Sequence, residues 1–236
     1  MNYHAIIFDL DGTLLDTLDD LTDSLNHALR LYNLPGRSRE EVRRFLGNGL
    51  RNLTEKAVPD GASAPVVELV LAALLGHYAR HCMEKTCPYP GIPELLNILK
   101  AQGYKLAIVS NKKDFAVQAL SKRFFGPLID SATGERDNIR KKPAPDMIYE
   151  ALHMLGNAAQ HTLYIGDSEV DLDTARNAGI DCIVADWGFR DRQFLIEHGA
   201  GTIVSHPVEI LEHLGIGPQF LIQLNQRGRF GEADGG

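Results

Sequence analysis

The sequence has few cysteines and no long apolar run. Its three cysteines, Cys82, Cys87 and Cys182, include no CxxC pair. An odd number without such spacing argues against a disulfide framework and favours a reducing compartment. No apolar run approaches the roughly 20 residues of a membrane-spanning helix, and the first one is too short for a signal peptide. We therefore expect a cytoplasmic protein that has no membrane partner.

Positive charge is also scarce. The 24 basic residues are outnumbered by 31 acidic ones, which gives a net charge of −7, and they form no stripe that could follow a phosphate backbone. We therefore expect no nucleic-acid partner. With 44% hydrophobic and 23% charged residues, the sequence is typical of a folded globular protein. Its 236 residues exceed one ordinary domain of about 150, so a core with an insertion is one option.

Short apolar runs recur along the sequence. Ala5–Phe8 ends at the turn signal Asp11-Gly12, as expected for a strand buried on both faces. Comparable runs lie at 105–111, 162–168, 181–186 and 202–205, with a less regular one at 128–133. Helical patterns separate most of them. This alternation predicts the α/β class, with a doubly wound parallel sheet.

One stretch breaks the alternation. Between Asp16 and Tyr89 the pattern is helical, with no convincing strand, and Ser38 with Glu41 fits a helix-starting capping box. We expect residues 1–15 and 88–224 to form the α/β core and 16–87 an inserted helical domain. The glycine-rich, polar segment 225–236 is predicted to be disordered.

Polar side chains follow the predicted strands. Asp9 and Asp11 are two residues apart, so they share a face at the carboxyl end of the first strand, where ligands bind in open α/β sheets. Taken alone, such a pair is more often a turn former or a helix cap than a catalytic pair. Further clusters at strand ends are Ser110 with Asn111, Lys142, and Asp167 with Asp171. Four clusters in this order indicate a catalytic site.

The motifs FDLDGT, VSN, KP and GDSEVD resemble the four ordered motifs of the haloacid dehalogenase superfamily. The helical insertion resembles the cap domain of its phosphatases. RFLGNGLRNL (44–53) and ADWGFRD (185–191) resemble phosphoglycolate phosphatases. The resemblance implies a Rossmann-like core with a helical cap and a magnesium-dependent phosphatase acting on a small anionic ester. Its best single substrate is 2-phosphoglycolate.

The resemblance also implies roles for single residues. Asp9 is the nucleophile that forms an aspartyl phosphate, and Asp11 is the general acid and base. Lys142 neutralises the phosphate and Asp9. Gly12, Ser110 and Asn111 complete the phosphate site.

The same resemblance implies a magnesium site and residues that select the substrate. The metal ligands are the Asp9 side chain, the Asp11 carbonyl and the Asp167 side chain, with Asp171 orienting a metal-bound water. Three residues are implied to contact the rest of the substrate: Asn48, Arg51 and Arg190.

Several alternatives stay open. A pyrophosphatase, a nucleotidase or a sugar phosphomutase fits the same motifs, although Thr13 favours a phosphatase over the mutases. Dehalogenases typically lack the second acid, which is present here as Asp11. A rival of another class is a catalytically silent, phosphate-binding regulator. The sequence leaves open both the physiological substrate and the choice between monomer and homodimer.

Overall fold

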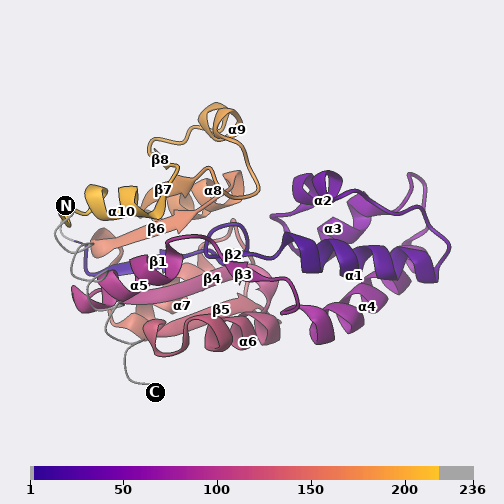
Figure 1. Ribbon diagram of the computed structural model, residues 1–236, viewed down its shortest axis with the longest axis horizontal. Coiled ribbons are helices and arrows are strands. Elements are labelled where there is room, and N and C mark those ends of the chain that lie inside the picture. Colours follow the sequence, from indigo (N-terminus) through magenta and orange to yellow (C-terminus); the bar gives the residue numbers. More distant parts are fainter. Residues whose placement is uncertain (1–2, 218–236) are drawn as a thin grey trace, which may run out of the picture.

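The computed structural model describes residues 3–217 of the chain, so the predicted disordered segment 225–236 lies outside the described residues. The core is one six-stranded sheet in the order β5-β4-β1-β6-β7-β8 (Figure 1). Its strands are β1 (Ala5–Phe8), β4 (Lys105–Lys113), β5 (Ser131–Glu135), β6 (Thr162–Gly166), β7 (Asp181–Ala185) and β8 (Ile203–Val204). Every neighbouring pair in this sheet is parallel, which confirms the predicted α/β class.

Strand β1 lies between β4 and β6, and all four of its residues are buried. Its side chains alternate between the two faces of the sheet, because successive residues of a strand point in opposite directions. Ile6 and Phe8 belong to the larger hydrophobic cluster, whereas Ala5 and Ile7 belong to the cluster on the other face. Burial on both faces explains why β1 reads as a continuous apolar run.

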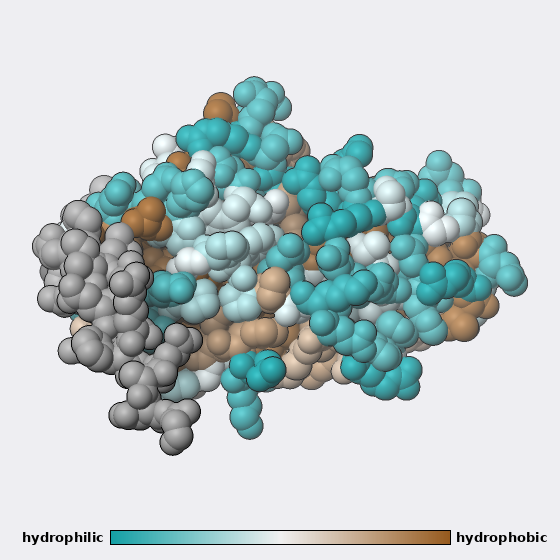
Figure 2. Space-filling model, in the orientation of Figure 1, coloured by the Kyte–Doolittle hydropathy of each residue, from teal (hydrophilic) through white to brown (hydrophobic). Residues whose placement is uncertain are grey.

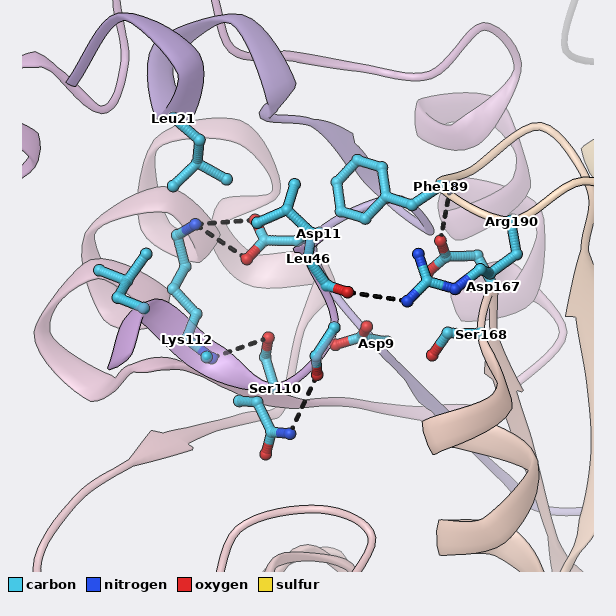
Figure 3. A pocket seen from close by; sticks show the side chains of 14 residues that line it. Asp9, Asp11, Leu21, Leu46, Ser110, Lys112, Asp167, Ser168, Phe189 and Arg190 are labelled. Atoms are coloured by element: carbon cyan, nitrogen blue, oxygen red, sulfur yellow. Dashed lines mark hydrogen bonds and ion pairs between the residues drawn. The ribbon is translucent and has the colours of Figure 1, made fainter. Parts of the chain in front are cut away.

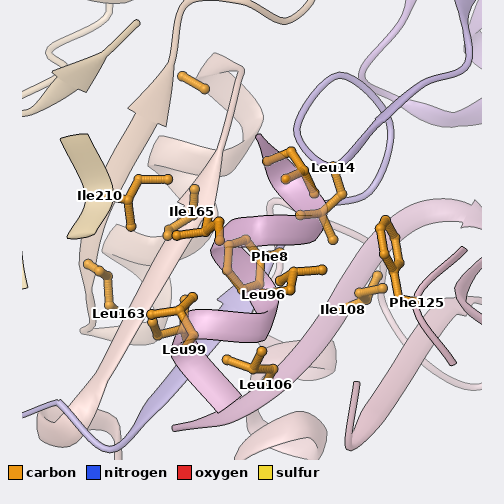
Figure 4. Packing of buried hydrophobic residues seen from close by; sticks show 14 of the residues in the cluster. Phe8, Leu14, Leu96, Leu99, Leu106, Ile108, Phe125, Leu163, Ile165 and Ile210 are labelled. Atoms are coloured by element: carbon orange, nitrogen blue, oxygen red, sulfur yellow. The ribbon is translucent and has the colours of Figure 1, made fainter. Parts of the chain in front are cut away.

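Helices cover both faces of the sheet. The larger cluster includes residues of α5 (Ile92–Ala101), α6 (Asp114–Phe124) and α10 (Pro207–His213). The opposite face packs against α7 (Asp146–Leu155) and α8 (Glu169–Ala178). The short helix α9 (Arg192–Glu197) follows β7. Figure 4 shows Phe8, Leu96, Ile108 and Ile165 together within the larger cluster.

Four helices form a bundle beside the carboxyl ends of the strands (Figure 1). They are α1 (Leu18–Leu31), α2 (Arg39–Phe45), α3 (Gly49–Ala57) and α4 (Ala64–His81). Their buried side chains, including Leu21 and Leu25 of α1, form a further hydrophobic cluster that also contains Ala116 and Phe189 of the core. The capping box of Ser38 and Glu41 is confirmed at the start of α2. We call these four helices the cap; its separation as a domain stays a prediction.

Two very short strands join the cap to the core. β2 (Leu15–Asp16) pairs antiparallel with β3 (Cys87–Pro88), so the two connecting segments lie side by side. The expectation of no strand between Asp16 and Tyr89 is therefore wrong at β3. Two residues are too few to show an alternating pattern, so this pair leaves no readable signal in the sequence.

The least regular predicted strand, 128–133, is displaced. Gly126–Leu128 form a short 3₁₀ turn, and β5 runs from Ser131 to Glu135. Its pairing with β4 is also interrupted by a register shift between Val109 and Lys113. An edge strand of this kind is half-exposed, and it therefore lacks the apolar run of the central strands.

Hydrophilic side chains predominate over the cap on the face shown in Figure 2. Among the helices of residues 3–217, none combines the length and apolarity that crossing a membrane requires.

Leu96 tests the packing between α5 and the sheet, because its side chain is fully buried in the larger cluster. We expect Leu96→Ala to lower the free energy of unfolding by about 2–5 kcal/mol, since the lost contacts and the resulting cavity both destabilise the protein. Urea denaturation measures the change. The control is Leu69→Ala, whose side chain is 49% exposed and which we expect to change stability by less than about 0.5 kcal/mol. Equal effects of the two variants would contradict the described packing.

Candidate active site

A pocket lies between the carboxyl ends of the central strands and the cap (Figure 3). The core contributes charged and polar side chains to it, and the cap contributes mainly apolar ones. From the core come Asp9, Asp11, Ser110, Asn111, Lys112, Asp167, Ser168, Phe189 and Arg190; from the cap come Leu21, Leu46, Gly47, Gly49 and Leu50. Parallel topology explains the meeting, because β1, β4 and β6 all end at this edge.

Lys142 joins two of the predicted carboxylates. Its buried ammonium lies 2.9 Å from Asp9 Oδ1 and 2.7 Å from Asp171 Oδ1. Burial alone would lower the pKa of Lys142, but the charges of Asp171 and Asp9 outweigh it and raise that pKa. Lys142 is therefore a permanent cation directly beside the predicted nucleophile.

Asp171 is the most fully hydrogen-bonded carboxylate of the site. Oδ1 accepts from Lys142 Nζ and from the Tyr164 hydroxyl, while Oδ2 accepts from the Asp167 and Ser168 amides and from Ser168 Oγ. Burial acts to raise the pKa of Asp171, but the Lys142 charge and these bonds lower it. Asp171 is thus an anion that positions its neighbours.

The negative charges of Asp9 and Asp167 are less well balanced by hydrogen bonds and cations than the charge of Asp171. Burial, opposed by Lys142 and reinforced by the negative charge of Asp171, raises the pKa of Asp9 to about 7. Burial and the charges of Asp171 and Asp9 raise the pKa of Asp167 well above its usual value. Each of the three carboxylates offers an oxygen, and these atoms all lie within 4.8 Å of one another. One lysine does not balance three clustered carboxylates, so this all-oxygen donor set fits a divalent cation such as Mg²⁺.

Close packing holds Asp167 in place. Its oxygens accept from Thr13 Oγ1 at 3.0 Å and from the Phe189 amide at 2.7 Å. Gly12, at a φ of +86°, and Gly188 both approach it so closely that an added Cβ would lie 2.3 Å and 2.4 Å from Asp167 Oδ2. Both positions therefore require glycine.

Gly12 differs from its expected role. Its amide donates to the Leu15 carbonyl at 2.9 Å, so this N–H closes the turn after β1 instead of facing a phosphate. Because Gly12 has no side chain, it leaves room for the Asp167 carboxylate.

Asp11 points into the pocket from the turn after β1. Lys112 Nζ lies 2.7 Å and 2.9 Å from its two oxygens, and Thr17 Oγ1 donates to Oδ1 at 2.8 Å. These contacts fix the carboxylate of the predicted acid and base. Lys112 was not among the residues predicted from the sequence. A signal was present, because Lys112 follows Ser110 by two positions on the same strand and such residues share a face.

Ser110 and Asn111 both line the pocket but differ in function. Ser110 Oγ accepts the Lys112 amide at 3.3 Å, which leaves its hydroxyl proton for a ligand. Asn111 Nδ2 donates to the carbonyls of Gly47 and Lys142, and its Oδ1 accepts the Lys142 amide. The Asn111 side chain therefore positions Lys142 and a cap turn.

The three predicted selectivity residues take different places. Arg190 is buried and lines the pocket. Asn48 reaches the core through its carbonyl, which accepts Lys141 Nζ at 2.9 Å. Arg51 pairs with Glu68 at 2.6 Å on the exposed side of the cap, and it is not among the described residues that line the pocket. Its guanidinium therefore does not face the pocket in this arrangement, and its substrate contact stays a prediction.

Residues 6–185 match the family model described as haloacid dehalogenase-like hydrolase. A phosphoglycolate phosphatase of Mesorhizobium japonicum is 36% identical over 222 residues, which cover 91% of this chain and 97% of that protein. The N-acetylmuramic acid 6-phosphate phosphatase of Pseudomonas aeruginosa is 31% identical over 225 residues, which cover 91% and 96% of the two chains.

Solved structures are similar in fold as well. A crystal structure of a proposed phosphoglycolate phosphatase from Lactobacillus delbrueckii superposes with a TM-score of 0.86 at 39% identity, covering 90% of this chain and 98% of that one. Another phosphoglycolate phosphatase, predicted in Haemophilus somnus, gives 0.84 at 29% identity and covers 91% and 99%.

The raised pKa of Asp9 predicts a stability change. As pH rises from about 4 to 7, the unfolded chain loses the Asp9 proton before the folded protein does, so stability falls across that window. Asp9→Asn removes this loss. In the presence of a chelator at pH 8, we expect the variant to be more stable than the wild type by roughly 2–4 kcal/mol in urea denaturation.

The exposed Asp173, paired with Arg176, provides the control, and Asp173→Asn should change stability by less than about 0.5 kcal/mol. The gain from Asp9→Asn should shrink toward pH 4. An Asp9→Asn variant no more stable than the wild type at pH 8 would contradict the unfavourable burial of this carboxylate.

Proposed function

This chain belongs to the haloacid dehalogenase-like hydrolase family, and we propose that it hydrolyses 2-phosphoglycolate to glycolate and phosphate. It is a phosphoric monoester hydrolase, like the phosphoglycolate phosphatases it resembles. The observation that carries the proposal is the placement of Asp9. Asp9 directly follows the central strand β1, and its carboxylate contacts the buried Lys142 and lines the pocket with Asp11.

In the first step, an Asp9 oxygen attacks phosphorus and the bond from phosphorus to the ester oxygen breaks. The leaving oxygen takes the proton of the Asp11 carboxyl group. Lys142 balances the charge on Asp9 and the phosphoryl group, and the Ser110 hydroxyl donates to a phosphoryl oxygen. The products of this step are the free alcohol and an aspartyl phosphate.

In the second step, water attacks phosphorus and gives a proton to Asp11. The bond between phosphorus and the Asp9 oxygen breaks, so that Asp9 returns to its carboxylate form and phosphate leaves. Asp11 thereby alternates between acid and base. Lys112 and Thr17 hold its carboxylate in place for both steps.

Mg²⁺ would be held by the side chains of Asp9 and Asp167 and by the Asp11 carbonyl, with Asp171 placed behind them. When bound, it supplies positive charge that offsets the repulsion between clustered carboxylates and a phosphate dianion. General acid–base catalysis contributes only about 10²–10⁴, whereas phosphate ester hydrolysis needs up to about 10²¹. Most of the acceleration must therefore come from positioning and charge.

The cap limits what can enter. Leu21, Leu46 and Leu50 line the pocket opposite the carboxylates, so a short leaving group fits between two closely spaced surfaces. Exclusion of water by these side chains strengthens the electrostatic contacts inside. A similar relative named for N-acetylmuramic acid 6-phosphate makes a sugar phosphate the principal rival substrate.

A panel of phosphate esters tests the substrate. With Mg²⁺, we expect 2-phosphoglycolate to give a kcat/KM at least about tenfold above those of pyrophosphate, a nucleoside monophosphate, a hexose 6-phosphate and N-acetylmuramic acid 6-phosphate, since each is larger or lacks the short leaving group. Released phosphate is the measurement. A flat profile, or a sugar phosphate in first place, would contradict the assignment.

Asp9→Asn tests the nucleophile. An amide oxygen does not form the phosphoryl intermediate, so turnover with Mg²⁺ should fall by at least about 10⁴ while the far-ultraviolet circular dichroism stays native. Asp173→Asn on the exposed surface of α8 removes the same charge outside the pocket and should keep full activity. Retained turnover in Asp9→Asn would exclude Asp9 as the nucleophile.

A further inference from the structure

Lys112 is an unusual cation because its side chain is almost completely buried and yet it lines the pocket. Its side chain is only 2% exposed, and its ammonium lies 4.7 Å from the centroid of the Tyr78 ring, which belongs to the cap helix α4. It contacts both oxygens of Asp11. Figure 3 shows its ammonium between Asp11 and Leu21, on the cap side of the carboxylates.

A substrate with two anionic groups meets an electrostatic problem here. Asp9, Asp11 and Asp167 all line the pocket, so a carboxylate on the leaving group would be repelled unless a cation faced it. Among the described lining residues the cations are Lys112 and Arg190. One of these two must therefore receive the second anion of such a substrate.

Arg190 already uses four of its five N–H donors within the protein. Its guanidinium binds both oxygens of Glu169, at 2.8 and 3.2 Å, and donates to the carbonyls of Leu46 and Arg43. In Figure 3 it lies beside Asp167 and Ser168, on the other side of Asp9 from Asp11. The leaving group departs toward Asp11, so Arg190 is on the wrong side to meet it.

We propose that Lys112 binds the carboxylate of the leaving group, and that the site therefore selects phosphate esters with an anion next to the ester carbon. This inference rests on the proposed function, and it names the residue that selects this class of substrate. In a glycolate ester the carboxylate carbon is two bonds from the ester oxygen. Once that oxygen contacts Asp11, the carboxylate reaches the ammonium that is 2.7 Å from Asp11 Oδ1.

The chemistry of the ammonium suits this double contact. Lysine offers three donors on a flexible stem, so one ammonium can serve the Asp11 carboxylate and a second carboxylate together. Lys112 is buried with its ammonium over the Tyr78 ring, and the low dielectric of a buried position strengthens an ion pair formed there.

The decisive comparison uses two esters of nearly equal shape. They are 2-phosphoglycolate and its uncharged amide, the phosphate ester of glycolamide. We expect the wild type to prefer the carboxylate, and Lys112→Met to reduce the ratio of the two kcat/KM values by about 10- to 100-fold, as loss of a charged hydrogen bond implies. A residue that only positions Asp11 would lower kcat/KM for both esters equally and leave the ratio unchanged.

Lys113→Met is the matched control, because Lys113 is the next residue and pairs with Glu135 at 3.0 Å outside the pocket lining. It should leave the ratio unchanged. Circular dichroism checks the folding of each variant, and Lys112→Gln replaces Lys112→Met if the latter does not fold.

The outcomes separate the two claims. A wild type that hydrolyses both esters without preference would overturn the phosphoglycolate assignment together with this inference. A wild type that prefers the carboxylate, with the preference intact in Lys112→Met and Lys112→Gln, would overturn the role of Lys112 alone. An equal loss of preference in Lys113→Met would likewise overturn it.

Discussion

The ion pairs of Lys142 are the interaction on which the site depends. One buried ammonium lies 2.9 Å from Asp9 and 2.7 Å from Asp171, and a buried carboxylate without such a partner is strongly destabilising. Asp171 can stay ionised because Lys142, Tyr164 and Ser168 all donate to it. Asp9 and Asp167 are left undercompensated. The fold thus holds an excess of negative charge that stability alone would not select and that a divalent cation can relieve.

Much of the fold and of the candidate site could be predicted from the sequence. The fold followed from periodicity, because strands buried on both faces leave continuous apolar runs, and Ala5–Phe8 is such a strand. The meeting of Asp9 and Asp167 followed from topology, because both directly follow parallel strands that end at one edge of the sheet. The individual roles came from resemblance, since spacing alone does not distinguish Asp171, which positions its neighbours, from Asp167.

What the sequence did not predict depends on contacts between distant segments. Lys112 shares a face of β4 with Ser110, but this spacing does not show that its ammonium reaches Asp11. Only the fold brings Lys112 to Asp11 and leaves Lys113 half-exposed beside Glu135. Gly12 looked like a phosphate contact, but its amide closes a turn and its missing side chain makes room for Asp167. Arg51 looked like a pocket residue because its turn faces the core, although its side chain points to Glu68.

At the turn formed by residues 46–48, the cap meets the core through its backbone carbonyls. Arg190 donates to the Leu46 carbonyl, Asn111 to the Gly47 carbonyl and Lys141 to the Asn48 carbonyl, so three consecutive cap carbonyls accept from core side chains. Every residue presents the same backbone carbonyl group, whatever its side chain. These three hydrogen bonds therefore do not depend on which side chains residues 46–48 carry. Under the proposed roles, the core carries out the reaction and selects charge through Lys112, and the cap side chains set the size and shape of the substrate.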